Sequence, residues 1–284
     1  MIAEQSSQTA LMAAAARAAH LLVDQPPVIF ADTLAATLLG ERADELIDYH
    51  RKHGDHLVLA GARAQAVCRS RFTEDVLARR VGEGVTQYVI LGAGLDSFGY
   101  RSSSPVRVFE VDHPATQRWK RGVLAAAGID IPGTVALVPV DFEADSLADR
   151  LAEHGFDPAR PAVVSWLGVT MYLTEDAIGR TLDVVGGFAP GTDIVVDYML
   201  PAGVRDTAGD AYVELVAPMS AERGEPWLTF LAPDDMSALL ATYGFGTAEH
   251  VDQRDVVGPA GWDRSDSLRP GRLSMLARAA VANR

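Results

Sequence analysis

Two glycines in one short turn are the residues of this chain whose type and spacing first suggest chemistry. The stretch YVILGAGLDSFGYR, residues 88–101, is an apolar run followed by Gly92 and Gly94 and then by acidic, aromatic and cationic residues. Because glycine has no side chain, the backbone of such a turn can lie close against a ligand. The third glycine of a dinucleotide fingerprint is replaced by Ser97, preceded by Asp96, and a carboxylate there disfavours a pyrophosphate.

Carboxylates stand at the ends of the next two apolar runs. Glu110 and Asp112 close the run VRVFEVD, and Asp141 closes VALVPVD and is followed by Phe142. A carboxylate at the end of the second strand can accept two hydrogen bonds from a ribose diol. Glu110 and Asp112 alternate onto the same face of the strand, so either can fill this role. Asp141 would reach an adenine amino group, and Phe142 would cover the ring.

These acidic residues distinguish between two candidate cofactors. A dinucleotide needs room for its pyrophosphate and usually a third Gly or Ala for close helix packing. S-adenosylmethionine has no phosphate, and its sulfonium and amino groups are cationic, so acidic neighbours suit it. The turn and the acids together therefore favour S-adenosylmethionine over a nicotinamide dinucleotide.

Strands and helices alternate from residue 86 onward. Five apolar runs have the length of buried strands, and helical stretches separate them: QYVIL, VRVFEVD, VALVPVD, AVVSW and DIVVDYM. Such alternation predicts an α/β fold with a doubly wound, mostly parallel sheet. The stretches TAEHVDQR and RLSMLARA predict two further strands, antiparallel at one edge, which makes seven.

The remaining segments predict how the sheet is covered. Residues 1–80 carry four helical patterns, the first capped by Ser6 or Ser7, and form a helical N-terminal cap. The Rossmann-like core of a single domain, 1–284, spans 86–200 and 233–284. Residues 201–232 show no regular pattern, and we interpret them as a lid over the substrate.

Charge and composition exclude several functions. The formal net charge is −13, whereas a nucleic-acid-binding protein usually shows a basic stripe. Cys68 is the only cysteine, so the chain has no internal disulfide, and this fits a reducing cytoplasm. No apolar window is long enough to span a bilayer. We expect a cytoplasmic protein that acts on a small molecule or a peptide.

Three motifs carry a family resemblance. VILGAGLDSFGYR, VFEVDHP and WLGVTMYLT, in this order, resemble the leucine carboxyl methyltransferase-like family of S-adenosylmethionine-dependent enzymes. The resemblance extends from about residue 8 to residue 245. It implies a class I methyltransferase fold, and its bacterial branch includes enzymes that methylate polyketide or peptide carboxylates.

The resemblance also implies which residues hold the cofactor. The turn Gly92, Ala93 and Gly94 would face its methionine part, Asp112 its ribose, and Asp141 with Phe142 its adenine. RSRFTEDVL resembles the family segment that binds the cofactor carboxylate, and Arg69 is the best match, with Arg71 as the alternate. A planar guanidinium suits a carboxylate because it pairs with both oxygens. One position departs from the family, since Leu167 follows the tryptophan where eukaryotic members carry Glu.

Other residues have two interpretations each. Asp96 is a helix cap or a ligand, and Tyr172 and Tyr198 are candidates for the substrate pocket because they follow the fourth and fifth strands. The histidines at 50, 53 and 56 have metal-like spacing, but the helix-breaking glycine at 54 favours a solvated polar face and no metal site. Three arginines can pin an anionic substrate, and the sequence does not choose among them: Arg63, Arg205 and Arg223.

These features predict a methyltransferase without an evident catalytic dyad. Methyl transfer from a sulfonium is an in-line displacement that needs alignment and exclusion of water. A carboxylate acceptor is ionised at neutral pH and needs no base. We therefore expect an O-methyltransferase acting on a carboxylate of a natural-product type. The alternatives are a hydroxyl acceptor, a cofactor-binding module without activity and, further off, an NAD-dependent oxidoreductase.

Overall fold

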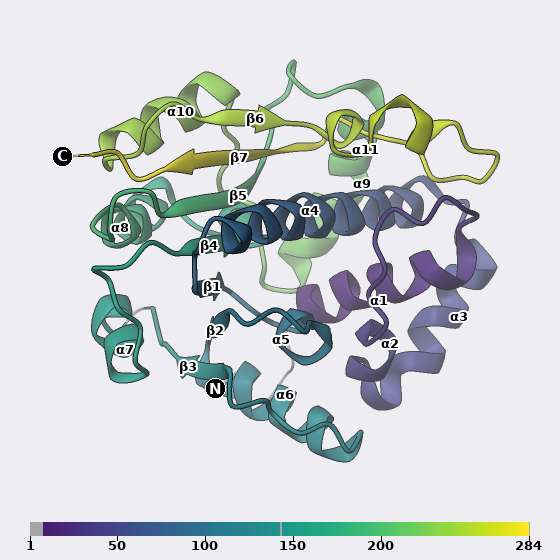
Figure 1. Cartoon of the computed structure of the whole chain (residues 1–284). Helices are drawn as coiled ribbons and strands as arrows, with labels where there is room; N and C mark the ends of the chain where they lie inside the picture. Colours follow the sequence, from purple (N-terminus) through teal and green to yellow (C-terminus); the bar gives the residue numbers. More distant parts are fainter. Residues whose placement is uncertain (1–7, 143, 284) are drawn as a thin grey trace.

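Seven strands form one sheet in the order β3-β2-β1-β4-β5-β7-β6 (Figure 1). The computed structural model describes residues 8–142 and 144–283, so Ser6 and Ser7 lie outside the described residues. Five strands are parallel and pair in the registers of a doubly wound sheet: β1 (Gln87–Leu91), β2 (Arg107–Asp112), β3 (Val135–Pro139), β4 (Val163–Trp166) and β5 (Asp193–Met199). β7 (Ser274–Ala280) is antiparallel to both β5 and β6 (Glu249–Val251). The predicted fold is confirmed.

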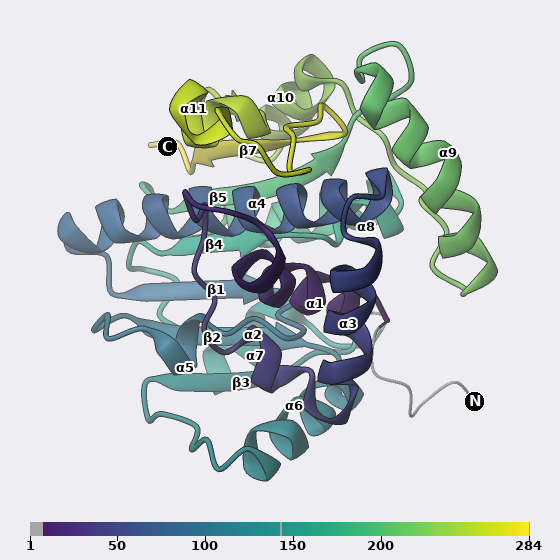
Figure 2. The ribbon, with the colours of Figure 1, turned by 90° about the vertical axis from the view of Figure 1, so that its right-hand side faces the viewer.

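Helices cover both faces of this sheet, which is why its central strands are apolar throughout. Every residue of β1 and β5 is buried. One face packs against α7 (Leu147–Glu153), α8 (Glu175–Gly186) and α10 (Pro233–Thr242) through the main core cluster. The other packs against α4 (Leu57–Gly82), α5 (Phe98–Arg101) and α6 (Pro114–Ala126). Figure 2 shows α4 running alongside the strands.

The N-terminal helices lie where the first strand ends. They are α1 (Gln8–Val23), the short α2 (Ala35–Leu38) with a 3-10 turn at Gly40–Arg42, and α3 (Ala43–His53). α1 packs on α2 and α3 through Leu11, Ala14 and Ala18, and the same cluster includes Leu95 just after the glycine turn. The second half of α4 belongs to the layer on the sheet, because Val76 and Leu77 pack there.

Two helices occupy segments in which the sequence predicted none. α9 (Thr207–Glu222) lies inside the stretch 201–232, and only Gly209 of its residues is buried. Its apolar residues Tyr212, Leu215, Val216 and Met219 recur at i, i+3, i+4 and i+7, the spacing of one helix face, and this is the signal that sequence reasoning missed. α11 (Gln253–Trp262) follows the strand predicted over TAEHVDQR, which is limited to β6. Its signal is the capping box formed by Asp252 and Asp255.

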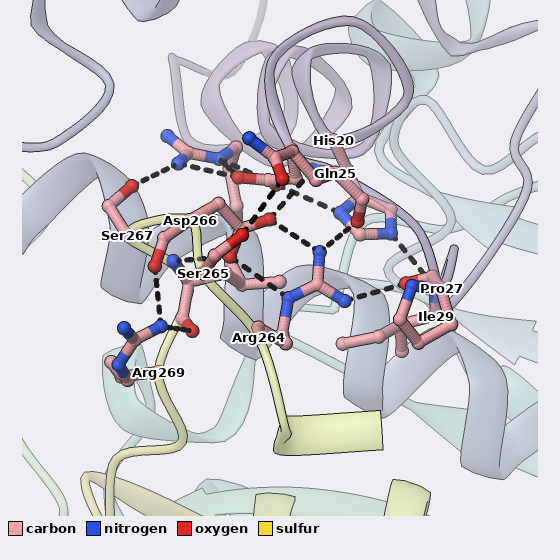
Figure 3. Close-up of polar contacts among 12 residues, drawn as sticks. His20, Gln25, Pro27, Ile29, Arg264, Ser265, Asp266, Ser267 and Arg269 are labelled. Atoms are coloured by element: carbon pink, nitrogen blue, oxygen red, sulfur yellow. Dashed lines mark hydrogen bonds and ion pairs between the residues drawn. The ribbon is translucent and has the colours of Figure 1, made fainter. Parts of the chain in front are cut away.

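A buried polar network joins the N-terminal helices to the loop before β7 (Figure 3). Arg63 of α4 donates twice to Asp24: Nε lies 2.9 Å from Oδ2, and Nη2 lies 2.9 Å from Oδ1. His20 Nδ1 also lies 2.9 Å from Asp24 Oδ2. Asp266 accepts from the backbone N–H of Gln25 at 2.7 Å. Arg264 donates to the carbonyl of Pro27 at 2.6 Å. These contacts fix the cap relative to the sheet. Among residues 8–142 and 144–283, no helix has the length and hydropathy to cross a bilayer.

Candidate functional site

The glycine turn after β1 has the backbone that the motif predicts. Gly92 and Gly94 have φ of +67° and +45°, in the left-handed region that favours glycine. A Cβ on Gly92 would lie 2.5 Å from Val169 Cγ2, and one on Gly94 would lie 3.0 Å from Ala10 Cβ. The N–H groups of Gly92 and Ala93 both donate to the carbonyl of Val111. The turn is therefore tied to β2 and covered by α1 and by the loop after β4.

Asp112 lies beside this turn. Its Oδ2 accepts from the N–H of Gly94 at 2.6 Å, and its Oδ1 accepts from the N–H of His113 at 2.7 Å. Burial raises the pKa of this carboxyl, while the two backbone donors oppose the shift. The Thr116 side chain is a third donor to this carboxylate, which can accept about four hydrogen bonds and so keeps capacity for a ribose hydroxyl.

Glu110, the alternative to Asp112 for the ribose, already has hydrogen-bond partners within the protein. It is buried and accepts from Lys120 Nζ at 2.6 Å and from the Tyr100 hydroxyl at 3.1 Å. Asp96 Oδ1 accepts from the N–H of Phe98, the first residue of α5, at 2.8 Å, although the N-cap position itself is Ser97. Asp96 therefore supports the start of α5.

Asp141 and Phe142 follow β3 at the same edge of the sheet. Asp112 pairs with Pro139 in the register of β2 and β3, so the two chain segments leave the sheet next to each other. The carbonyl of Asp141 accepts from the N–H of Asp145 at 2.7 Å, which closes a turn. The ring of Phe142 is 49% exposed, a large apolar group without cover in this structure.

Arg69 of α4 is held next to the loop after β4. Its Nη1 donates to Asp197 Oδ2 at 3.1 Å, and Asp197 Oδ1 accepts from the N–H of Gly168 at 2.6 Å. A Cβ on Gly168 would lie 2.8 Å from Arg69 Nη1, so the glycine makes room for the guanidinium. Arg71 is about half exposed and pairs with Asp75 within its own helix. Sequence reasoning missed Asp197, whose signal is a carboxylate inside the apolar run DIVVDYM.

A cavity of about 610 Å³ opens between α1, α3, α4 and α9 and reaches Arg69 and Gly168. This volume lies within the range of small-molecule sites, roughly 300–1,000 Å³. Most of its wall is apolar or aromatic, and sequence reasoning had not assigned these members: Met12, Leu46, Leu59, Met171, Met199, Tyr212, Leu215, Val216, Met219 and Trp227. Figure 2 shows α9 at the outer edge of the domain, with α1 and α3 nearer its centre.

The two tyrosine candidates have different positions. Tyr172 lines the cavity, and its hydroxyl lies 3.3 Å from Thr9 Oγ1. Tyr198 does not line it, since its ring is buried in the main core and its hydroxyl lies 2.8 Å from His250 Nδ1. Successive residues of a strand face opposite sides, so Met199 and not Tyr198 meets the cavity. The expectation of a pocket-lining Tyr198 is therefore corrected.

The histidines at 50, 53 and 56 do not all belong to the solvated polar face that the sequence predicted. His50 is buried, with Nδ1 3.3 Å from Arg63 Nη1, and burial together with Arg63 lowers its pKa to about 4. His56 caps α4, since its Nδ1 accepts from the N–H of Val58. Within the part of the chain that the structure describes, no group of three His, Cys, Asp or Glu side chains is placed to hold a metal.

The three arginines that the sequence offered for an anionic substrate have different positions. Arg223 lines the cavity, whereas Arg63 forms an ion pair with Asp24 and Arg205 one with Asp210. Leu167 packs in an apolar cluster that includes Val76 and Val195.

Solved structures share this architecture. A methyltransferase structure from Thermobifida fusca matches with a TM-score of 0.60 and 20% identity, covering 87% of this chain and 92% of that one. A Streptomyces avermitilis protein of the duf574 family matches with a TM-score of 0.57 and 16% identity, over 94% and 97% of the two chains. The protein therefore has the class I, Rossmann-like methyltransferase fold.

Sequence comparison defines the family. The model described as leucine carboxyl methyltransferase matches residues 10–186. The Bacillus subtilis protein YktD, whose name places it among the S-adenosyl-L-methionine-dependent methyltransferases, is 31% identical over 93% of this chain and 94% of its own. A Mycolicibacterium vanbaalenii protein named in the same way is 30% identical over 92% and 86%. This chain belongs to the leucine carboxyl methyltransferase family and is an S-adenosylmethionine-dependent methyltransferase.

Proposed function

We propose that this enzyme transfers a methyl group from S-adenosylmethionine to a carboxylate of a small molecule or peptide, of the natural-product type. The observation that carries the carboxylate assignment is the state of the cavity histidines. Burial lowers the pKa of His50 to about 4, and His56 Nδ1 is taken by the N–H of Val58. His50 is therefore a weak base, the Nδ1 lone pair of His56 is already engaged, and a carboxylate acceptor requires no base.

The residues at the sheet edge fit the cofactor. Asp112 is oriented by two backbone N–H groups and can accept from the ribose hydroxyls. Arg69 is 14% exposed and borders the cavity, so its guanidinium is available to the cofactor carboxylate. Phe142 offers an uncovered ring for the adenine, next to Asp141. When bound, the cofactor supplies a methyl group on a cationic sulfur.

The chain's own contribution is alignment and exclusion of water. α1 covers the glycine turn through Ala10 and borders the cavity through Thr9. The Thr9 hydroxyl donates to Glu225 Oε2 at 2.5 Å, and Glu225 follows α9. This contact joins the N-terminal cap to the segment 201–232, and we propose that the two together close over the acceptor.

The test is turnover of labelled S-adenosylmethionine with matched carboxylic acids and alcohols. Carboxylic acids should yield products that mild alkali releases, because methyl esters hydrolyse and methyl ethers do not. The chemical step should change little between about pH 6 and pH 9, since a carboxylate with a pKa near 4 stays ionised. An alkali-stable product whose rate rises tenfold per pH unit would identify a hydroxyl acceptor and overturn the carboxylate assignment.

A further inference from the structure

The mouth of the cavity carries large apolar side chains that are open to solvent. Met12, Tyr49, Leu215 and Met219 are 38%, 57%, 47% and 48% exposed, and all four line the cavity. They come from α1, α3 and α9. Exposed apolar groups gathered around a cavity mark a binding surface for an apolar ligand. The ligand that fits is therefore apolar along its length and extends as far as the mouth.

The wall formed by the turn after β4, the end of β5 and the segment after α9 is different, because it holds a donor without a partner among the described residues. Trp227 packs with Met171 and Met199, and these three residues line the cavity. Its indole Nε1 is buried and has no hydrogen-bond partner among the described residues. A buried N–H left unpaired is unfavourable. An acceptor atom of a ligand in the cavity would satisfy it.

Tyr212 of α9 supplies a second donor in the same cluster. Its ring rests on α4, where a Cβ on Gly61 would lie 3.1 Å from Tyr212 Cδ2, so the ring has a defined place. No described residue forms a hydrogen bond with its hydroxyl. Burial and the neighbouring Tyr172 raise the pKa of Tyr212 to about 12, so the hydroxyl keeps its proton at neutral pH. The Tyr172 hydroxyl instead lies against Thr9.

We infer that the methyl acceptor is an amphipathic carboxylic acid whose carboxylate is held by Trp227 Nε1 and the Tyr212 hydroxyl and whose apolar chain runs to the mouth between α3 and α9. This inference rests on the proposed function. The two donors pair with the oxygen atoms, and the apolar wall selects the chain. Arg223 at the mouth is the competing anchor, because it lines the cavity and is exposed.

Binding of simple probes tests the inference without turnover. Octanoate, decanoate and dodecanoate are titrated by calorimetry into the enzyme loaded with S-adenosylhomocysteine, with the matching 1-alkanols as neutral probes. Affinity should rise about fourfold for each added CH₂ while the chain stays within the cavity. Each acid should bind more tightly than its alcohol.

Four variants locate the carboxylate. Trp227→Phe and Tyr212→Phe should each weaken acid binding about 10- to 100-fold, the effect of losing a hydrogen bond to a charged group, and weaken alcohol binding less. Tyr243→Phe removes a hydroxyl from a residue that packs on the main core and does not line the cavity, and it is the matched control, with binding unchanged. Arg223→Gln should leave the preference for acids over alcohols intact. Unchanged thermal unfolding shows that each variant is folded.

The outcomes separate this inference from the proposed function. If Arg223→Gln removes the acid preference and Trp227→Phe does not, the carboxylate sits at the mouth and the inference is overturned. If the two donor variants methylate carboxylates with unchanged KM, the inference fails while the proposed function stands. If only alcohols are methylated and their KM rises in both donor variants, the donor positions hold and the carboxylate assignment fails.

Discussion

The sheet edge that we propose for the cofactor (the cofactor edge) and the cavity that we propose for the acceptor are built in different ways. At the edge, Gly92, Gly94 and Asp112 lie within 21 residues and are held together by backbone N–H groups and left-handed glycines. The cavity is assembled from α1, α3, α4 and α9, whose residues lie as far apart as Gln8 and Trp227. A site made of local backbone is tied to one ligand, whereas a site made of distant side chains can vary with the acceptor.

Arg69 lies where the two regions meet, and its removal should have the largest effect. Arg69→Met leaves Asp197, 2% exposed, without its ion-pair partner, and should lower the free energy of unfolding by about 3–5 kcal/mol. Denaturant unfolding measures this loss. The double variant Arg69→Met/Asp197→Asn should recover most of the stability but not cofactor binding. Recovery of both would remove Arg69 from the cofactor site.

Acid should destabilise the cap through His50. The pKa of His50 is lowered to about 4 from an ordinary 6.5, so the unfolded chain binds the proton more readily. Above about pH 6.5 His50 is neutral in both the folded and the unfolded chain. As the pH falls from 6.5 towards 4, the free energy of unfolding should decrease by about 3 kcal/mol. His50→Gln should make unfolding less dependent on pH across this window. Equal slopes for both proteins would contradict the burial of a neutral His50.

Gly92→Ala should damage the cofactor edge alone. The new Cβ would meet Val169 Cγ2 at 2.5 Å, and the left-handed backbone adds about 1–2 kcal/mol of strain. Calorimetry should show S-adenosylhomocysteine binding weakened at least tenfold, with alkanol binding unchanged. Gly128→Ala is the matched control, since Gly128 has a φ of +68° and nothing within 4 Å of a Cβ. If both variants lost the same affinity for S-adenosylhomocysteine, backbone strain and not the contact with Val169 would explain the loss.

Asp112→Asn should weaken cofactor binding by about 1–3 kcal/mol, because an amide retains one acceptor oxygen in place of two. Isothermal titration with S-adenosylhomocysteine gives the value. Glu110→Gln is not an equivalent change, since it leaves Lys120 buried without its counter-ion and acts on stability. Normal affinity in Asp112→Asn would move the ribose contact elsewhere.

Gly61→Ala should have the smallest effect and only on the cavity. The added methyl would press on the Tyr212 ring at 3.1 Å, a distance that a small shift of the ring relieves. We expect the acceptor KM to rise about twofold to fivefold with cofactor affinity unchanged, as initial-rate kinetics would show. A change in cofactor affinity instead would mean that the two regions are coupled through α4.

Local patterns were sufficient for the sheet and the turn. The runs QYVIL and DIVVDYM coincide with β1 and β5, because an uninterrupted apolar run is required where helices cover both faces. The glycines at 92 and 94 were recognisable since only that residue adopts their backbone without strain. α9 was missed although Tyr212, Leu215, Val216 and Met219 have helical spacing, because Pro218 stands inside the pattern and argues against a continuous helix.

The sequence by itself determined the fold class and the family, and it led to the edge proposed for the cofactor, since these depend on short runs of adjacent residues. Only the tertiary structure decided among side chains of equal type. Lys120 of α6 forms an ion pair with Glu110, and His250 of β6 bonds Tyr198. The position of these partners beside the two candidates follows only from the packing of α6 and β6 on the sheet, whereas the pair of Arg71 with Asp75 lies within α4. The cavity wall, with Trp227 and Tyr212, likewise exists only once α9 packs beside α4.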